Sequence, residues 1–183
     1  MVSVQHQFPP HTGDDASDIQ NWLAALSGTF APKEIELIRQ ACEFAAPLYQ
    51  GSSDLTGTPL LQHALGSAAI LIGLNMDAEA IAATALHAVP NFIKDAHLVL
   101  RERFGANVAG LVEGISRMEH VRQFSEVRGQ PSTEEAAQQV ETLRKMLLAM
   151  VEDIRVVLIK LAERTQTLRH LSRVDAELQR KVA

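Results

Sequence analysis

Two histidines have the chemistry to bind a metal ion or to move a proton, and both lie in apolar stretches of the sequence. His63 follows Leu60-Leu61-Gln62, and His87 follows Ala83-Thr84-Ala85-Leu86. A lone histidine in such a stretch more often packs in the core with a backbone partner. Two on neighbouring apolar segments favour a shared site, because imidazole is a common metal ligand.

The apolar residues recur with helical spacing, so helices must position these histidines. Gly51–Pro59, which precedes His63, is rich in glycine, serine, threonine and aspartate and is expected to be a loop. The segment 120–133 is expected to be a connector. Helices are expected over 18–27, from Pro32, over 59–73, 77–89, 94–104 and 107–119, from Glu134, and after Glu152-Asp153.

Three polar or imino residues are expected to set helix ends. Asp18 fits the N-cap of the first helix, and Pro32 fits the first turn of the second. Pro90 disfavours a helical conformation in the residue before it, so the helix that carries His87 should end near Val89. His87 is therefore expected inside a helix.

The bulk composition indicates a globular all-α domain. Hydrophobic residues make up 46% of the 183 residues but aromatic residues only 4%, so leucine, alanine, isoleucine and valine must build the core. Seventeen basic against 22 acidic residues give a net charge of −5, which excludes a generally basic surface for nucleic acid. Cys42 has no partner for an intrachain disulfide and is expected to be a buried helix residue.

The ends of the chain suggest how it is organised. Residues 1–17 are polar and rich in turn formers, and we expect a flexible lead-in followed by a single domain over 18–183. The chain has no signal peptide and no apolar run long enough for a membrane span, which favours a cytoplasmic location. The helical pattern stops at Ala183 without a terminator, so a fragment of a longer multidomain protein is expected.

Longer motifs in the chain resemble the hydrolase domain of the RelA/SpoT family over roughly residues 30–175. They are Gly57-Thr58-Pro59-Leu60-Leu61-Gln62-His63, Ala85-Leu86-His87-Ala88, Leu143-Arg144-Lys145-Met146-Leu147-Leu148-Ala149-Met150 and Asp153-Ile154-Arg155-Val156-Val157-Leu158-Ile159-Lys160-Leu161-Ala162-Glu163-Arg164. The resemblance implies an all-α HD bundle of about eight to ten helices. Active members of the family hydrolyse the 3′-pyrophosphate of guanosine tetraphosphate or pentaphosphate with a manganese ion.

The resemblance also implies which metal ligands should be present. Active members hold manganese with a first histidine, a His-Asp pair and a late aspartate. These positions correspond here to His63, to His87 with Ala88, and to Glu163. Ala88 has no lone pair with which to bind a hard cation, while Glu163 keeps a carboxylate on a longer side chain. We therefore expect no metal cofactor, although His63, His87 and Glu163 together resemble a two-His one-Glu zinc set.

Two further groups of the family's functional residues are replaced. The acidic pair that serves the attacking water corresponds to Asn91 and Phe92, neither of which can act as a general base. The nucleotide-contacting Arg-Lys pair corresponds to Asp54 and Leu55, and the late asparagine to Thr167. A carboxylate at position 54 is expected to repel a polyphosphate. Catalytic and nucleotide-binding residues are therefore not expected.

The resemblance is to RelA-type members, the monofunctional guanosine tetraphosphate synthetases, whose HD domain has lost its metal site. It implies a structural and regulatory role toward an adjacent synthetase domain of the same chain, in the stringent response. Ribosome and transfer RNA would be contacted only through downstream domains. Two alternatives stay open: a residual metal-dependent 3′-pyrophosphohydrolase using His63, His87 and Glu163, and an HD phosphohydrolase acting on a different small substrate.

Overall fold

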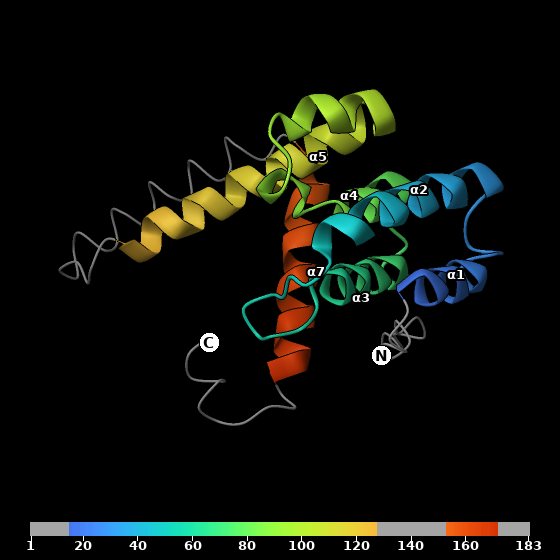
Figure 1. The fold of residues 1–183 in the computed structure, drawn as a ribbon, viewed down its shortest axis with the longest axis horizontal. Helices are drawn as coiled ribbons and strands as arrows, with labels where there is room; N and C mark the ends of the chain where they lie inside the picture. The colour runs from blue at the N-terminus through green and yellow to red at the C-terminus, as the bar shows by residue number, and fades with distance from the viewer. Residues whose placement is uncertain (1–14, 128–152, 172–183) are drawn as a thin grey trace.

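The chain folds into an all-α bundle, which confirms the expected class. Figure 1 shows the computed structural model, which describes residues 15–127 and 153–171 and contains no strand within them. The described α-helices number six rather than the expected eight to ten, and the segment expected to be helical from Glu134 lies outside the described residues. The helices are α1 (Asp15–Ala25), α2 (Pro32–Tyr49), α3 (Leu60–Gly73), α4 (Ala78–Ala85), α5 (Ala96–Val127) and α7 (Ile154–Leu171), with a 3₁₀ turn at Val89–Asn91.

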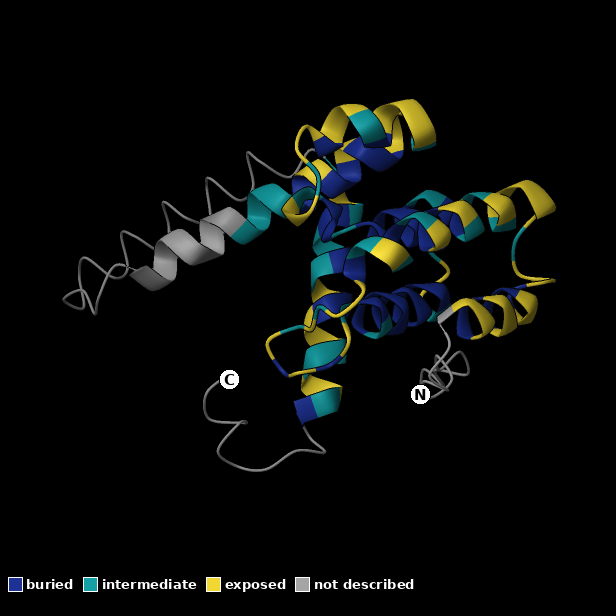
Figure 2. Ribbon diagram, viewed as in Figure 1, coloured by how far each residue is buried: buried dark blue, intermediate teal, exposed yellow. Residues whose placement is uncertain are grey.

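The centre of the bundle is formed by α3 and α4, which are almost entirely apolar. Eleven of the residues of α3 and seven of α4 are buried, so neither helix has an amphipathic pattern. In Figure 2 both appear mostly dark blue, with α2 on one side and α7 crossing them. The helices α3 and α4 therefore hold the histidine-bearing segments at fixed positions.

Two glycines allow α7 to approach its neighbours closely. A Cβ atom on Gly66 of α3 would collide with the side-chain amide of Gln166, and one on Gly114 of α5 would lie 2.8 Å from Cγ2 of Val156. Both Cβ atoms would lie closer to the side chain on α7 than real Cβ atoms do to their neighbours. A side chain at either glycine would therefore force the neighbouring residue of α7 to move. These approaches place α7 against α3 and α5.

The segment from residue 94 to 127 confirms one expectation and corrects another. The two helices expected over 94–104 and 107–119 are the two parts of α5, which meet at a kink at Gly105, where the backbone is not helical and φ is 87°. Glycine takes this left-handed conformation without a steric penalty, so the chain can bend and continue. The connector expected from residue 120 is wrong as far as 127, because α5 continues to Val127 and its C-terminal part extends away from the other helices (Figure 1).

The end of α4 differs from the expected one. This helix ends at Ala85 rather than near Val89, so His87 and Ala88 lie in the turn that follows it and not inside a helix. The amides of His87 and Val89 bond to the carbonyls of Thr84 and Leu86, three residues back. The chain then tightens into the 3₁₀ turn Val89–Asn91, which contains Pro90, a residue with no N–H to continue an α-helix.

The first helix begins earlier than expected. It starts at Asp15, so Asp18 lies inside α1 rather than at its N-cap, and its side chain is buried. The apolar face predicted for this helix is confirmed, because Ile19, Trp22, Leu23 and Leu26 are all buried. Pro32 opens α2 as predicted, and residues 51–59 form the expected loop.

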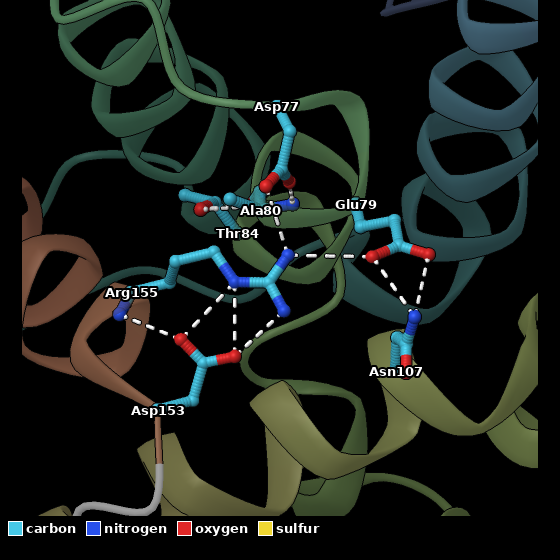
Figure 3. A network of polar contacts seen from close by, with 7 residues as sticks. All are labelled: Asp77, Glu79, Ala80, Thr84, Asn107, Asp153 and Arg155. Atoms are coloured by element: carbon cyan, nitrogen blue, oxygen red, sulfur yellow. Dashed lines mark hydrogen bonds and ion pairs between the residues drawn. The ribbon is translucent and has the colours of Figure 1, made fainter.

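A charged cluster attaches the start of α7 to the start of α4 (Figure 3). The guanidinium of Arg155 bonds to both oxygens of Asp153, to Asp77 at 2.9 Å and to Glu79 at 3.3 Å. Asp77 also caps α4 by accepting from the amide of Ala80. Asp153 precedes α7 as predicted and accepts from the amide of Arg155, which fixes the first turn of that helix.

Among the described helices, none combines the length and the apolar character needed to cross a lipid bilayer.

Candidate functional site

The first histidine is held by a carboxylate from the loop that precedes its helix. Nδ1 of His63 lies 3.0 Å from Oδ2 of Asp54, and both side chains are largely buried. The other oxygen of Asp54 accepts from the amides of Thr56 and Thr58 and from the hydroxyl of Thr56. Asp54 therefore organises the loop and fixes the ring of His63 at once.

The ionisation of Asp54 follows from these contacts. Burial alone would raise its pKa, but the hydrogen bonds from His63 and Thr56 outweigh burial and lower the pKa to about 2. The carboxylate is thus charged at neutral pH and can only accept, so Nδ1 of His63 must be the donor. The sequence-based expectation was that a carboxylate at position 54 would repel a polyphosphate; the structure adds that this carboxylate is directed to His63.

The second histidine lies in the turn after α4. Its Nδ1 atom is 3.0 Å from the carbonyl oxygen of Thr84, which can only accept, so Nδ1 carries the proton here too. Burial lowers the pKa of His87, with the nearby Glu163 opposing this shift. A neutral imidazole with a protonated Nδ1 keeps a lone pair on Nε2, the form in which histidine binds metals.

Tyr49, at the C-terminal end of α2, fixes the turn that carries His87. Its hydroxyl donates to the carbonyl of Ala85 at 3.1 Å and accepts from the amide of Ala88 at 3.0 Å. Burial raises the pKa of Tyr49, so the phenol stays protonated. Its ring packs near both the His87 and the Phe92 rings, with centroid distances of 6.3 and 5.5 Å.

The two histidine rings lie close together, as their positions in the sequence predict. Their centroids are 6.3 Å apart, and the planes are inclined by 55°. The charge of Glu163, on α7, raises the pKa of His87 and of Tyr49, so this carboxylate lies near the same turn. The fold thus places the two histidine rings side by side, with Glu163 near His87.

Glu163 is engaged by a lysine one turn earlier on α7. The ammonium of Lys160 lies 2.6 Å from Oε2 of Glu163 and 3.1 Å from Oε2 of Glu119 on α5. Burial would lower the pKa of Lys160, but the two carboxylates outweigh this and raise it. Lys160 is therefore a charged ammonium whose donors point to both carboxylates.

These residues do not fit the manganese ion held by active family members. Ala88 is buried and supplies no ligand atom, and one oxygen of Glu163 is taken by Lys160. Within residues 15–127 and 153–171, no three histidine, cysteine or carboxylate side chains are grouped so that they could hold a metal ion.

The remaining predicted positions add neither a base nor a cation. Asn91 and Phe92 are exposed, and the Phe92 ring packs on Tyr49. Leu55 has 73% of its surface exposed at the tip of the loop. The hydroxyl of Thr167 donates to the carbonyl of Glu163 in its own helix.

The only cysteine of the chain does not supply a nucleophile. Cys42 is fully buried in α2, as predicted, and burial raises the pKa of its thiol to about 12. The thiolate that a nucleophilic cysteine needs is not formed at neutral pH.

Comparison with known proteins assigns the family. The HD domain family matches residues 41–183. This chain is an HD domain. It is 33% identical over 162 residues to the bifunctional (p)ppGpp synthase/hydrolase SpoT of Escherichia coli K12, covering 88% of this chain and 22% of that protein. It is 32% identical over 171 residues to the GTP pyrophosphokinase of the same strain, covering 93% of this chain and 22% of that protein.

A third relative shows the same pattern. The GTP pyrophosphokinase of Myxococcus xanthus is 34% identical over 150 residues, covering 82% of this chain and 19% of that protein. The HD domain is therefore related to the SpoT and RelA proteins of (p)ppGpp metabolism, and it spans about a fifth of the length of these relatives.

Sequence reasoning missed three residues of this site: Tyr49, Glu119 and Lys160. Each acts through a contact with a distant or differently oriented element, which helical periodicity does not reveal. A lysine and a glutamate three apart on one helix are a recognisable signal, because such side chains share a face. Tyr49 is the only tyrosine and lies at a helix end, but neither feature predicts its partners.

Proposed function

We propose that this chain is a catalytically inactive HD domain of a RelA-type GTP pyrophosphokinase, with a structural and regulatory role toward the synthetase domain of the same protein. The observation that carries the proposal is the state of the cleft. Ala88 stands where a carboxylate ligand is needed, and Glu163, the one carboxylate from α7, is bound to Lys160.

The absence of a proton acceptor at the expected place supports the same proposal. Hydrolysis of a pyrophosphate requires a group that orients or deprotonates the attacking water. Asn91 and Phe92 follow the histidine turn where the acidic pair of active members is expected, and neither can take a proton. The carboxylate of Asp54 is used by its loop and by His63.

The outward face of α7 supports a contact with another part of the parent protein. Ile154, Leu161 and Leu168 recur every seven residues, opposite the buried side of the helix, and have 67%, 58% and 49% of their surfaces exposed. An apolar stripe of this kind marks an interaction surface. We assign it to the synthetase domain of the longer parent protein, because the HD domain spans only about a fifth of the length of its relatives.

In this proposal the domain acts in the cytoplasm by restraining or transmitting synthetase activity. It would do so through two states of contact with the synthetase domain that differ in free energy. Ribosome and transfer RNA would be bound by other domains of the parent protein. Replacing Leu161 by glutamate in that parent would alter its rate of pyrophosphate transfer without altering the fold of the HD domain.

A second candidate function is a residual metal-dependent 3′-pyrophosphohydrolase. It is favoured by the two histidines, which both engage Nδ1 and so can present Nε2 to an ion. A carboxylate behind a histidine is also the arrangement that supports many metal-binding histidines. Against it stand the bond between Lys160 and Glu163 and the missing carboxylate at Ala88.

Turnover separates the two candidates. The purified chain is incubated with guanosine tetraphosphate and manganese or zinc, and release of guanosine diphosphate and pyrophosphate is followed. The proposal predicts no release above that of the buffer. Metal-dependent release that is abolished by His87→Ala would overturn it in favour of the residual hydrolase, and His97→Ala serves as the matched control because His97 lies on the surface of α5.

A further inference from the structure

Glu163 is a carboxylate in a place where a negative charge needs compensation. Its side chain is only 8% exposed, and its Oε1 atom is buried with no hydrogen-bond partner among the described residues. A buried carboxylate that lacks a compensating charge is strongly destabilising. A cation beside Glu163 relieves this cost in the folded chain.

The cation present is the ammonium of Lys160. It lies 2.6 Å from Oε2 of Glu163 and 3.1 Å from Oε2 of Glu119, and only 24% of the lysine side chain is exposed. Glu119 belongs to α5, whereas Glu163 and Lys160 belong to α7. A single ammonium thus joins carboxylates from two helices, as a bridging metal ion does.

The alternative cation, a divalent metal, is poorly served by the same cleft. His63 and His87 contribute neutral donor atoms at best, and Ala88 contributes none. Histidines alone would leave a divalent ion short of negative charge, since hard cations prefer carboxylate ligands. The carboxylate from α7 would have to leave its lysine first.

We propose that the ammonium of Lys160, and not a divalent metal, balances the charge of Glu163 in this HD domain, so that α5 and α7 are held together by an internal cation and the fold does not depend on a divalent metal. This inference rests on the proposed loss of metal chemistry. It names Lys160 as the residue that keeps the site stable without a metal. It also assigns to Lys160 the connection between α5 and α7.

Thermal unfolding of the 183-residue chain tests the proposal. Wild type, Lys160→Met, Glu163→Gln and the double variant are compared in EDTA and in 1 mM manganese. The Tm of the wild type is expected to agree within about 1 °C in the two solutions. Lys160→Met is expected to lose on the order of 5 °C, because it strands two carboxylates. The double variant is expected to recover at least half of that loss.

Lys94→Met is the matched control, because Lys94 is exposed in the turn before α5. It is expected to change the Tm far less than Lys160→Met does. If Lys160→Met does not fold, the comparison between Glu163→Gln and the double variant decides. If the ammonium balances the charge of Glu163, the Tm of the double variant should lie close to that of Glu163→Gln.

Two results would overturn the proposal. A wild-type Tm that falls in EDTA and rises with manganese would show that a metal is the compensating cation. A Lys160→Met variant as stable as Lys94→Met would show that Lys160 balances nothing. Both readouts are stabilities, so they are independent of the turnover assay, and a chain without hydrolase activity could still fail this test.

Discussion

The Nδ1 atom of His63 and the Oδ2 atom of Asp54 lie 3.0 Å apart, and this pair joins the loop before α3 to the candidate site. Asp54 occupies the place where active relatives are expected to contact a nucleotide. Here its two oxygens are used by the loop amides and by the histidine. Asp54, which was not expected to bind a nucleotide, therefore has a structural role: it orders the loop and orients His63.

Replacing Asp54 by asparagine should make the fold less sensitive to acid. Its folded pKa of about 2 lies below its ordinary value of 3.8, so its stabilisation is fully present above about pH 4. That stabilisation is lost as the pH falls from about 4 toward 2. Its size is about 1–2 kcal/mol after allowance for partial exposure. Urea unfolding of both proteins at a series of pH values measures the difference.

The control for Asp54→Asn is Asp54→Ala, which also removes the hydrogen bonds to the amides of Thr56 and Thr58. It should be less stable than asparagine at every pH, since asparagine keeps one acceptor oxygen. An asparagine variant whose stability falls as steeply as that of wild type between pH 4 and pH 2 would contradict the assignment.

Removing the hydroxyl of Tyr49 should loosen the turn that carries His87. In Tyr49→Phe, the carbonyl of Ala85 and the amide of Ala88 both lose a buried partner. Leaving such groups unpaired costs about 1–3 kcal/mol in the free energy of unfolding. Urea unfolding gives the loss, and hydrogen exchange should show faster exchange of the Ala88 amide. Unchanged exchange at Ala88 would count against the role of Tyr49.

Three glycines on α3 and α5 should respond differently to alanine. At Gly110, which is exposed and has open space around its Cβ position, alanine should raise the free energy of unfolding by about 0.5–1 kcal/mol. At Gly114 the new Cβ would meet the stiff side chain of Val156, and a loss of about 1–3 kcal/mol is expected. Gly66 should fall between them, because the flexible amide of Gln166 can move.

Urea unfolding of the three variants gives this order directly, with Gly110→Ala as the internal control. Adding Val156→Ala to Gly114→Ala should return part of the loss, because it removes the colliding methyl groups. A destabilised Gly110→Ala together with a neutral Gly114→Ala would show that α5 and α7 do not approach as described.

Much of the fold is predictable from the sequence, because it depends on local patterns. The apolar face of α1, the start of α2 at Pro32 and the loop at 51–59 all follow from residue type and spacing. The predicted end of α4 was less accurate, because Pro90 sets only the last residue at which the helix could end. The true end at Ala85 depends on Tyr49, 36 residues away in the sequence.

The candidate site was likewise predictable only in part. The rings of His63 and His87 lie side by side, as their positions in the sequence predict, and Glu163 lies near His87. The partners that decide their chemistry, Asp54 for His63 and Lys160 for Glu163, depend on how separate elements pack or on which rotamer a side chain takes. Composition and periodicity do not contain that information.

Replacing Arg155 by methionine should weaken the attachment of α7 to α4. It would leave Asp77, Glu79 and Asp153 close together without their shared cation (Figure 3). These carboxylates are partly exposed, so a loss of only about 1 kcal/mol is expected in urea unfolding, and less in 1 M salt. Arg39→Met is the control: Arg39 pairs with Glu36 and Glu43 on the surface of α2, and its loss should have little effect.

An Arg155→Met loss that is no larger than that of Arg39→Met would contradict the anchoring role. Arg155→Lys should recover only part of the stability, because an ammonium cannot reproduce the forked bonds to Asp153.

The most direct test of the central claim is the manganese content of the chain at equilibrium. The protein is dialysed against 0.1 mM manganese at neutral pH, and bound metal is measured against the dialysis buffer. A cleft that has lost its metal site should retain far less than one ion per chain, and His87→Ala should not change the value. One ion per chain that disappears in His87→Ala would contradict the claim and show that His63, His87 and Glu163 still form a metal site.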